Sequence, residues 1–198
     1  MTDDAPAAAP ADASLAGKLL VAMPGMGDPR FSHTVIMMCS HDAQHAMGIV
    51  INKPKDEVTL KEVLSHLGLQ AAADLAARAV MDGGPVRQER GYVLHTDDYA
   101  AQEGTHPVAP GISLTATREV LEAVARENAN APKRFVLALG CSGWGAGQLE
   151  NELKENAWLI VDADDAIIFG EPHENKWDRA IRSLGIDPAQ LSDTAGRA

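Results

Sequence analysis

The residues best suited to do chemistry lie in the glycine-rich run from Gly140 to Gly147, which also contains a cysteine and a serine. An apolar stretch that predicts a strand, residues 135–139, precedes the run, and a helical pattern, residues 148–156, follows it. Such a loop would present unpaired backbone N–H groups at the positive end of a helix dipole, where an anion or a developing negative charge is stabilised. We therefore predict a ligand-binding loop, whose contact residues are Gly143, Trp144, Gly145 and Gly147.

Two residues of this run, Cys141 and Ser142, are candidate nucleophiles. A thiol at a helix N-terminus can have a lowered pKa, and residues 140–143 begin like the G-x-S-x-G turn of serine hydrolases. However, Trp144 stands where that turn needs its last glycine, and the one histidine after the run is His173. An enzyme that uses Cys141 or Ser142, with backbone N–H groups as an oxyanion hole, is therefore an alternative hypothesis.

The spacing of the glycines does not match a known nucleotide-binding motif. It follows neither the Rossmann nor the P-loop pattern, and no lysine ends the run. Our first hypothesis is a noncatalytic regulatory or ligand-binding protein that takes a small anion. The turns Asn52-Lys53-Pro54 and Gly83-Gly84-Pro85 are expected near the loop, with Lys53 as the source of positive charge. The further predicted ligand contacts are Asn52, Lys53, Gly83 and Gly84.

One cluster has residue types that could bind a metal: Cys39, His41 and His45, with His33 nearby. On a strand, Cys39 and His41 share a face, and His45 returns across the following turn. More often, such histidines are polar residues at a solvated turn and the cysteine belongs to the core. We therefore predict no metal and no cofactor.

Composition indicates a single soluble domain. At 198 residues, 45% of them hydrophobic, the chain suffices for one well-filled core. The formal net charge of -11 and the scattered basic residues disfavour direct binding to DNA. The two cysteines lie far apart in the sequence, and the start of the chain does not resemble a leader peptide. No apolar run approaches the ~20 residues that are needed to span a bilayer. We therefore expect a cytoplasmic protein without a membrane segment. A protein partner stays open, and no oligomeric state is predicted.

Hydrophobic patterns predict the elements. Strands are expected at residues 18–23, 34–40, 46–52, 80–82, 91–96, 112–116, 135–139, 158–161 and 166–169. Thr59 and Glu62 form a capping box for a helix that Gly68 ends, and later helices are expected after Thr117, after the glycine run and from Trp177 to Leu184. The alanine-rich residues 71–79 have helix propensity, but they contain few large apolar side chains that could pack against the core.

The predicted strands form hairpins in the first part of the chain and alternate with helices in the later part. This order indicates an α+β fold with a mixed or largely antiparallel sheet. We place a single domain at residues 15–191, after a disordered tail at 1–14 and before a C-terminal tail at 192–198. The N-terminal tail is predicted because its alanines, prolines and aspartates bury too little apolar surface to offset the entropy of ordering.

Several strings in the chain resemble the YqgE/AlgH family of bacterial proteins. They are Ala22-Met23-Pro24, AMGIVINKP at 46–54, Gly83-Gly84-Pro85, GYVLH at 91–95 and SGWGAGQLE at 142–150. The resemblance implies one α+β domain built on a branched, mostly antiparallel sheet surrounded by helices. It brings no reaction and no catalytic residues. Members are commonly labelled transcriptional regulators, so regulation through DNA or a protein partner is a further alternative.

Overall fold

Ten strands run through the part of the chain that the computed structural model describes, residues 14–99, 103–126, 130–170 and 172–191. In chain order they are β1 (Lys18–Ala22), β2 (Val35–His41), β3 (His45–Val50), β4 (Pro54–Thr59), β5 (Ala79–Asp82), β6 (Val86–Thr96), β7 (Thr105–Ala109), β8 (Ile112–Thr115), β9 (Phe135–Gly145) and β10 (Trp158–Asp162). The helices are α1 (Leu60–His66), α2 (Arg118–Arg126), α3 (Gln148–Lys154), α4 (Asp165–Ile168) and α5 (Lys176–Ser183). Short 3-10 turns cover Pro29–Phe31, His173–Asn175 and Pro188–Gln190.

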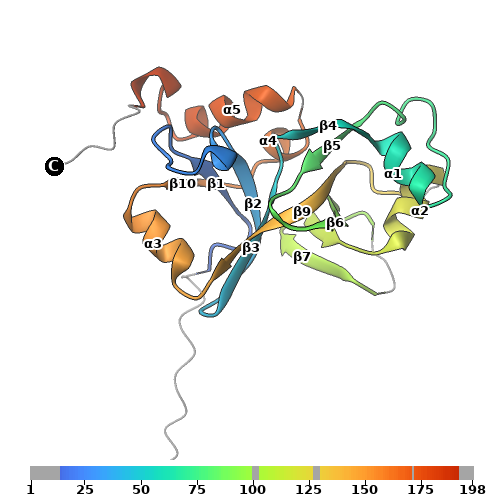
Figure 1. The fold of residues 1–198 in the computed structure, drawn as a ribbon, viewed down its shortest axis with the longest axis horizontal. Coiled ribbons are helices and arrows are strands. Elements are labelled where there is room, and N and C mark those ends of the chain that lie inside the picture. The colour runs from blue at the N-terminus through green and yellow to red at the C-terminus, as the bar shows by residue number, and fades with distance from the viewer. Residues whose placement is uncertain (1–13, 100–102, 127–129, 171, 192–198) are drawn as a thin grey trace, which may run out of the picture.

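Strand β9 joins the two halves of the sheet (Figure 1). The order along the main path is β10-β1-β2-β3-β9-β6-β8-β7, and β4 and β5 branch from it where β5 pairs with β9. The first part of β9 pairs with β6, and its last residues, 142–145, pair with β3. The β5–β9 pair is parallel, whereas the other strand pairs are antiparallel. The fold is α+β, as the sequence predicts.

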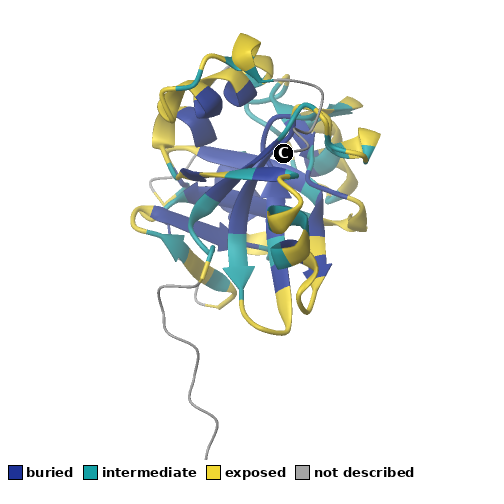
Figure 2. Cartoon of the chain, turned by 90° about the vertical axis from the view of Figure 1, so that its left-hand side faces the viewer, coloured by how far each residue is buried: buried dark blue, intermediate teal, exposed yellow. Residues whose placement is uncertain are grey.

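The early strands are apolar at successive positions because both of their faces are buried. In β1, Leu19 and Val21 pack into a cluster that α4 and α5 cover, whereas Leu20 and Ala22 face a second cluster that includes Leu149 of α3. A third cluster lies between α1, α2 and the sheet. Figure 2 shows these buried strands at the centre and exposed helix faces at the outside.

The sheet curls strongly around the second of these clusters. Strands β9 and β10 are separated by three strands in the sheet order, yet the rings of Trp144 on β9 and Trp158 on β10 are 6.2 Å apart, centroid to centroid. Helix α3 lies between the two strands in sequence and packs Leu149 against the same cluster. The curl therefore brings the glycine-rich end of β9 close to the edge strand.

Most predicted elements are confirmed. The capping box of Thr59 and Glu62 begins α1, and Gly68 follows the helix with a φ of 71°. The hairpin is present as β2 and β3, and the last helix lies at residues 176–183. Leu184, which directly follows that helix, is 41% exposed. None of the helices in the described residues is long and apolar enough to cross a membrane.

The prediction of a loop at residues 140–145 is wrong. Strand β9 continues through Gly145, and Ser142 to Gly145 pair with β3. Glycine is needed at position 140, because another backbone lies too close there for a side chain. Gly140 has a φ of 79°, and a Cβ on it would lie 2.4 Å from the carbonyl oxygen of Gly84.

Two further segments differ from the predictions. Residues 165–168 form α4 rather than a strand, because the Asp164 carboxylate caps a helix by accepting from the N–H groups of Ala166 and Ile167. The alanine-rich residues 71–78 form turns, so packing overrides their helix propensity. Of the predicted tails, residues 1–13 and 192–198 lie outside the described residues, whereas Ser14 donates a hydrogen bond to the carbonyl oxygen of His41.

Candidate functional site

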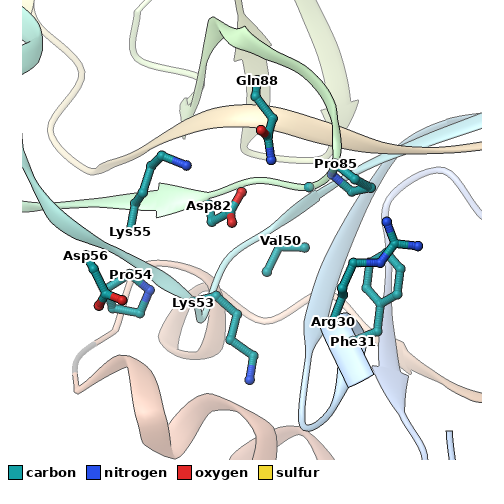
Figure 3. Close-up of a pocket in the computed structure, with 11 residues that line it drawn as sticks. Arg30, Phe31, Val50, Lys53, Pro54, Lys55, Asp56, Asp82, Pro85 and Gln88 are labelled. Carbon is teal, nitrogen blue, oxygen red and sulfur yellow. The ribbon is translucent and has the colours of Figure 1, made fainter. Parts of the chain in front are cut away.

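A cavity of about 460 Å³ lies where the turn between β3 and β4 meets the turn between β5 and β6 (Figure 3). Three basic side chains line it, Arg30, Lys53 and Lys55, together with Asp82. Gly84, Pro85 and Gln88 come from the β5–β6 side, and Phe31 and Val50 provide apolar surface. The volume lies within the range of small-molecule sites, about 300–1,000 Å³.

Asn52 fixes the turn that carries Lys53. Its side-chain oxygen accepts from the N–H of Val35 at 2.8 Å, and its side-chain nitrogen donates to the carbonyl oxygen of His33 at 2.8 Å. A backbone hydrogen bond joins this turn to the end of β5, because the N–H of Asp82 donates to the carbonyl oxygen of Lys53 at 2.8 Å. Asn52, predicted as a ligand contact, is thus buried and occupied in holding the backbone that positions Lys53.

The glycines of the second turn permit two backbones to touch. A Cβ on Gly83 would lie 2.2 Å from the carbonyl oxygen of Gly140, and one on Gly84 would lie 2.4 Å from the carbonyl carbon of Cys141. Any side chain at these positions would push β5 away from β9. Gly83 is buried against β9, whereas Gly84 also lines the cavity.

The cavity lysines have no acidic partner. Neither Lys53 nor Lys55 forms a salt bridge with any residue that the structure describes, whereas Arg30 is paired with Asp28 at 2.7 Å. Both lysines are half-buried, and burial lowers the pKa of Lys53 from its ordinary value. In Figure 3 the Lys55 side chain extends toward Asp82, while the Lys53 side chain leaves its turn in another direction.

Asp82 contributes an acceptor to the same cavity. Its Oδ1 atom is buried and has no hydrogen-bond partner among the described residues. Figure 3 places the carboxylate between Lys55 of β4 and Gln88 of β6, with Asp56 on the far side of Pro54. The site therefore combines ammonium groups, a carboxylate oxygen and an amide around one hollow.

Two of the four predicted contacts of the glycine-rich run, Gly143 and Trp144, lie at a neighbouring cavity. Ser142, Gly143 and Trp144 line a hollow of about 310 Å³ that shares Arg30, Phe31 and Pro85 with the first one. The premise of unpaired N–H groups at a helix start is wrong for Gly145, whose N–H donates to the side-chain oxygen of Gln148 at 3.2 Å. Gly147 precedes a helix of only seven residues. Ligand contact by Gly143, Trp144, Gly145 and Gly147 stays a prediction.

The two candidate nucleophiles lack an activating base in the described residues. Cys141 is buried, and its thiol contacts the Tyr92 hydroxyl at 3.9 Å. Ser142 is 1% exposed, and its Oγ has no hydrogen-bond partner. Activation requires a base within hydrogen-bond reach, so this geometry offers no support for nucleophilic catalysis.

The candidate metal ligands have separate roles. His41 accepts from the N–H of Leu15 at 3.0 Å through Nδ1, and its Nε2 lies 2.8 Å from Glu150 Oε1. His45 lies 3.1 Å from Asp42. Cys39 packs against the core, and burial raises the pKa of its thiol to about 12. The described residues contain no group of three side chains of metal-binding type close enough to hold an ion.

Sequence reasoning missed five charged or amide residues of the cavity beside Lys53: Arg30, Lys55, Asp56, Asp82 and Gln88. No local pattern identifies Lys55, because it lies on β4, whereas the candidate Lys53 lies in the turn before that strand. The polar composition of β4 concealed that strand. Asp82 directly precedes Gly83-Gly84, but no local pattern shows that its carboxylate faces Lys55.

The family model for AlgH-like proteins matches residues 19–189. The chain belongs to the AlgH-like family. It is 50% identical to a UPF0301 protein of Caulobacter vibrioides over 184 residues, which cover 93% of this chain and 94% of that relative. It is 49% identical to a UPF0301 protein of Ruegeria pomeroyi over 185 residues, or 93% of this chain and 99% of the relative.

Solved structures of the AlgH-like type share the fold. The solution structure of AlgH from Pseudomonas aeruginosa matches with a TM-score of 0.76 and 36% identity, over 100% of both chains. A crystal structure of protein DIP2367 from Corynebacterium diphtheriae matches with a TM-score of 0.67 and 21% identity, over 92% of this chain and 89% of the other. The second likeness concerns the fold alone. The family confirms the predicted resemblance and brings no established reaction.

Proposed function

We propose that this protein is a noncatalytic, cytoplasmic ligand-binding protein that takes a small anionic metabolite in the cavity beside Lys53. The observation that carries the proposal is the pair of half-buried lysines, Lys53 and Lys55, which face a cavity of about 460 Å³ without an acidic partner among the described residues. Holding a partly desolvated cation is unfavourable, and an anion bound beside it offsets that cost.

The charge of the whole chain also distinguishes this cavity from the rest of the surface. The formal net charge is -11, so an anion approaching most of the surface is repelled. Several other basic side chains are neutralised in pairs, including Lys18 with Asp162 and Arg118 with Glu122. On a surface that is mostly negative, Lys53 and Lys55, which are unpaired within the part of the chain that the structure describes, make this cavity a favourable place for an anion to bind. Two free cysteines support a reducing compartment.

Calorimetric titration with inorganic phosphate at constant ionic strength tests the proposal. Lys53→Ala and Lys55→Ala are each expected to weaken phosphate binding about tenfold, since a charge-assisted hydrogen bond contributes ~1.5–3 kcal/mol. Lys61→Ala is the matched control, because Lys61 is an exposed lysine of α1 and its loss changes the net charge equally. A thermal scan gives a second readout, because a ligand at a hundredfold its Kd stabilises by ~2.7 kcal/mol.

Two results would contradict anion binding at this cavity. The first is the lack of any titration heat or thermal shift with phosphate and with a panel of carboxylated and phosphorylated metabolites at millimolar concentration. The second is an equal loss of binding in Lys53→Ala and Lys61→Ala, which would indicate a general effect of charge.

A further inference from the structure

One buried acceptor in the cavity is unused by the protein. Oδ1 of Asp82, the last residue of β5, has no hydrogen-bond partner among the described residues. The main-chain N–H of Asp82 is already bonded to the carbonyl oxygen of Lys53. A buried carboxylate oxygen without a donor is costly, and native proteins keep few such groups.

The neighbouring cations do not satisfy this oxygen. Lys53 and Lys55 line the same cavity and form no salt bridge with Asp82. Gln88 approaches from β6 without a hydrogen bond to it (Figure 3). The cavity therefore presents two separate demands to a ligand: negative charge for the lysines and a hydrogen-bond donor for Asp82.

The charges around the cavity decide which kind of donor fits. A ligand ammonium group would face the Lys53 and Lys55 ammonium groups and be repelled by them. A hydroxyl group is neutral, and it donates to a carboxylate without adding charge. An anion that lacks a donor would meet the Asp82 carboxylate with repulsion and leave Oδ1 unpaired.

We propose that the ligand of this cavity is a hydroxylated anion, such as a phosphorylated polyol, whose hydroxyl group donates to Oδ1 of Asp82 while its acid group lies near Lys55, the lysine that extends toward Asp82 (Figure 3). This inference rests on the proposed function and adds the class of ligand. A site built to bind a hydroxyl group rejects the analogue that lacks it, because the buried acceptor is then left unpaired. Asp82 is thus the specificity-determining residue of the cavity.

The test compares glycerol 3-phosphate with n-propyl phosphate, which share a phosphate and a three-carbon chain and differ in two hydroxyl groups. Calorimetric titration of the full chain is expected to give about tenfold tighter binding of glycerol 3-phosphate, the effect of one hydrogen bond to a charged group. In Asp82→Ala the preference is expected to vanish, so that both compounds bind equally. In Asp82→Asn, which keeps the shape of the side chain, it is expected to fall at least threefold.

Asp56→Ala is the matched control. Asp56 lines the same cavity but is exposed, so its removal changes the charge without removing the buried acceptor. The tenfold preference is expected to persist in this variant, with both compounds bound slightly more tightly. Circular dichroism of each variant checks the fold, and Asp82→Asn provides the comparison if Asp82→Ala does not fold.

The outcomes separate the two proposals. Equal binding of the two compounds by the unaltered chain would overturn the hydroxyl inference and leave anion binding intact. A preference that persists in Asp82→Ala and in Asp82→Asn would overturn the assignment to Asp82. If neither compound binds, anion binding itself fails, and the inference fails with it.

Discussion

At the scale of single residues, Glu152 has the most connected side chain near the glycine-rich end of β9. Its Oε2 accepts from the indole N–H of Trp144 at 2.9 Å and from that of Trp158 at 2.8 Å. Its Oε1 accepts from Gln148 at 3.0 Å. One carboxylate thus attaches helix α3 to a central strand and to an edge strand. Trp144, predicted as a ligand contact, also has this structural role.

Replacing Glu152 by alanine is expected to destabilise the fold by about 3 kcal/mol, because two buried indole donors lose a charged acceptor. For a chain of this size, that loss lowers Tm by ~6–12 °C. Differential scanning calorimetry measures the change, and tryptophan fluorescence reports the two rings. Glu155→Ala, at an exposed position after the same helix, is the control and should leave Tm nearly unchanged. Equal Tm values for both variants would show that the indole contacts contribute nothing.

At the scale of elements, β9 depends on a close approach between two backbones. The run Gly83-Gly84 lies against Gly140 and Cys141, where β5 and β6 both meet β9. Gly140 adopts a φ of 79°, which a residue with a Cβ rarely adopts. The two glycine motifs are therefore parts of one contact, and neither is a loop selected for flexibility.

Gly140→Ala is expected to destabilise the protein by about 3 kcal/mol or more, since the new Cβ meets both an unfavourable backbone conformation and the carbonyl oxygen of Gly84. Urea unfolding, followed by circular dichroism, measures this change in the free energy of unfolding. Gly145→Ala is the matched comparison on the same strand, because a Cβ there meets no atom within 4 Å. Its effect should stay within about 1 kcal/mol. A stability loss in Gly145→Ala as large as in Gly140→Ala would refute this explanation.

Local sequence patterns predicted the apolar strands and the capped helix because hydrophobic periodicity and capping act over a few residues. They did not predict β4 and β7, which contain Pro54 and Pro107. Strand β4 pairs with β5, about twenty residues later, and β7 pairs with the adjacent β8. Local patterns also interpreted Gly140 to Gly145 as a loop. A glycine that permits close packing looks the same in sequence as one that permits a turn. For the site, Lys53 was placed in the right turn, whereas Asp82 needed the β4–β5 pairing to be seen.

At the scale of the whole molecule, charge separates the candidate functions. Many basic side chains are paired with carboxylates, among them Arg134 with Asp165, Lys133 with Asp98 and Arg182 with Asp187. Pairing of this kind removes the free positive charge that contacts with phosphates of DNA require. The small cluster at Lys53 and Lys55 suits one anionic group and is too small for a duplex.

We therefore expect no complex with a 30-base-pair duplex in a gel-shift assay at low salt, where nonspecific binding is strongest. The physical reason is the formal net charge of -11, which repels the DNA backbone. A basic DNA-binding domain run in parallel confirms that the assay detects weak complexes. A band shift that weakens as salt rises would support the alternative of direct regulation through DNA.

The position of β9 as the ninth of the ten described strands also bears on synthesis. Strands β3, β5 and β6 all pair with it, yet β9 begins at Phe135. While the first 134 residues leave the ribosome, the halves of the sheet have no common strand on which to assemble. The two halves of the sheet can then join only after Gly145 has emerged, and the apolar hairpin made earlier stays uncovered for that interval. Nascent chains of this protein are thus expected to be clients of ribosome-associated chaperones.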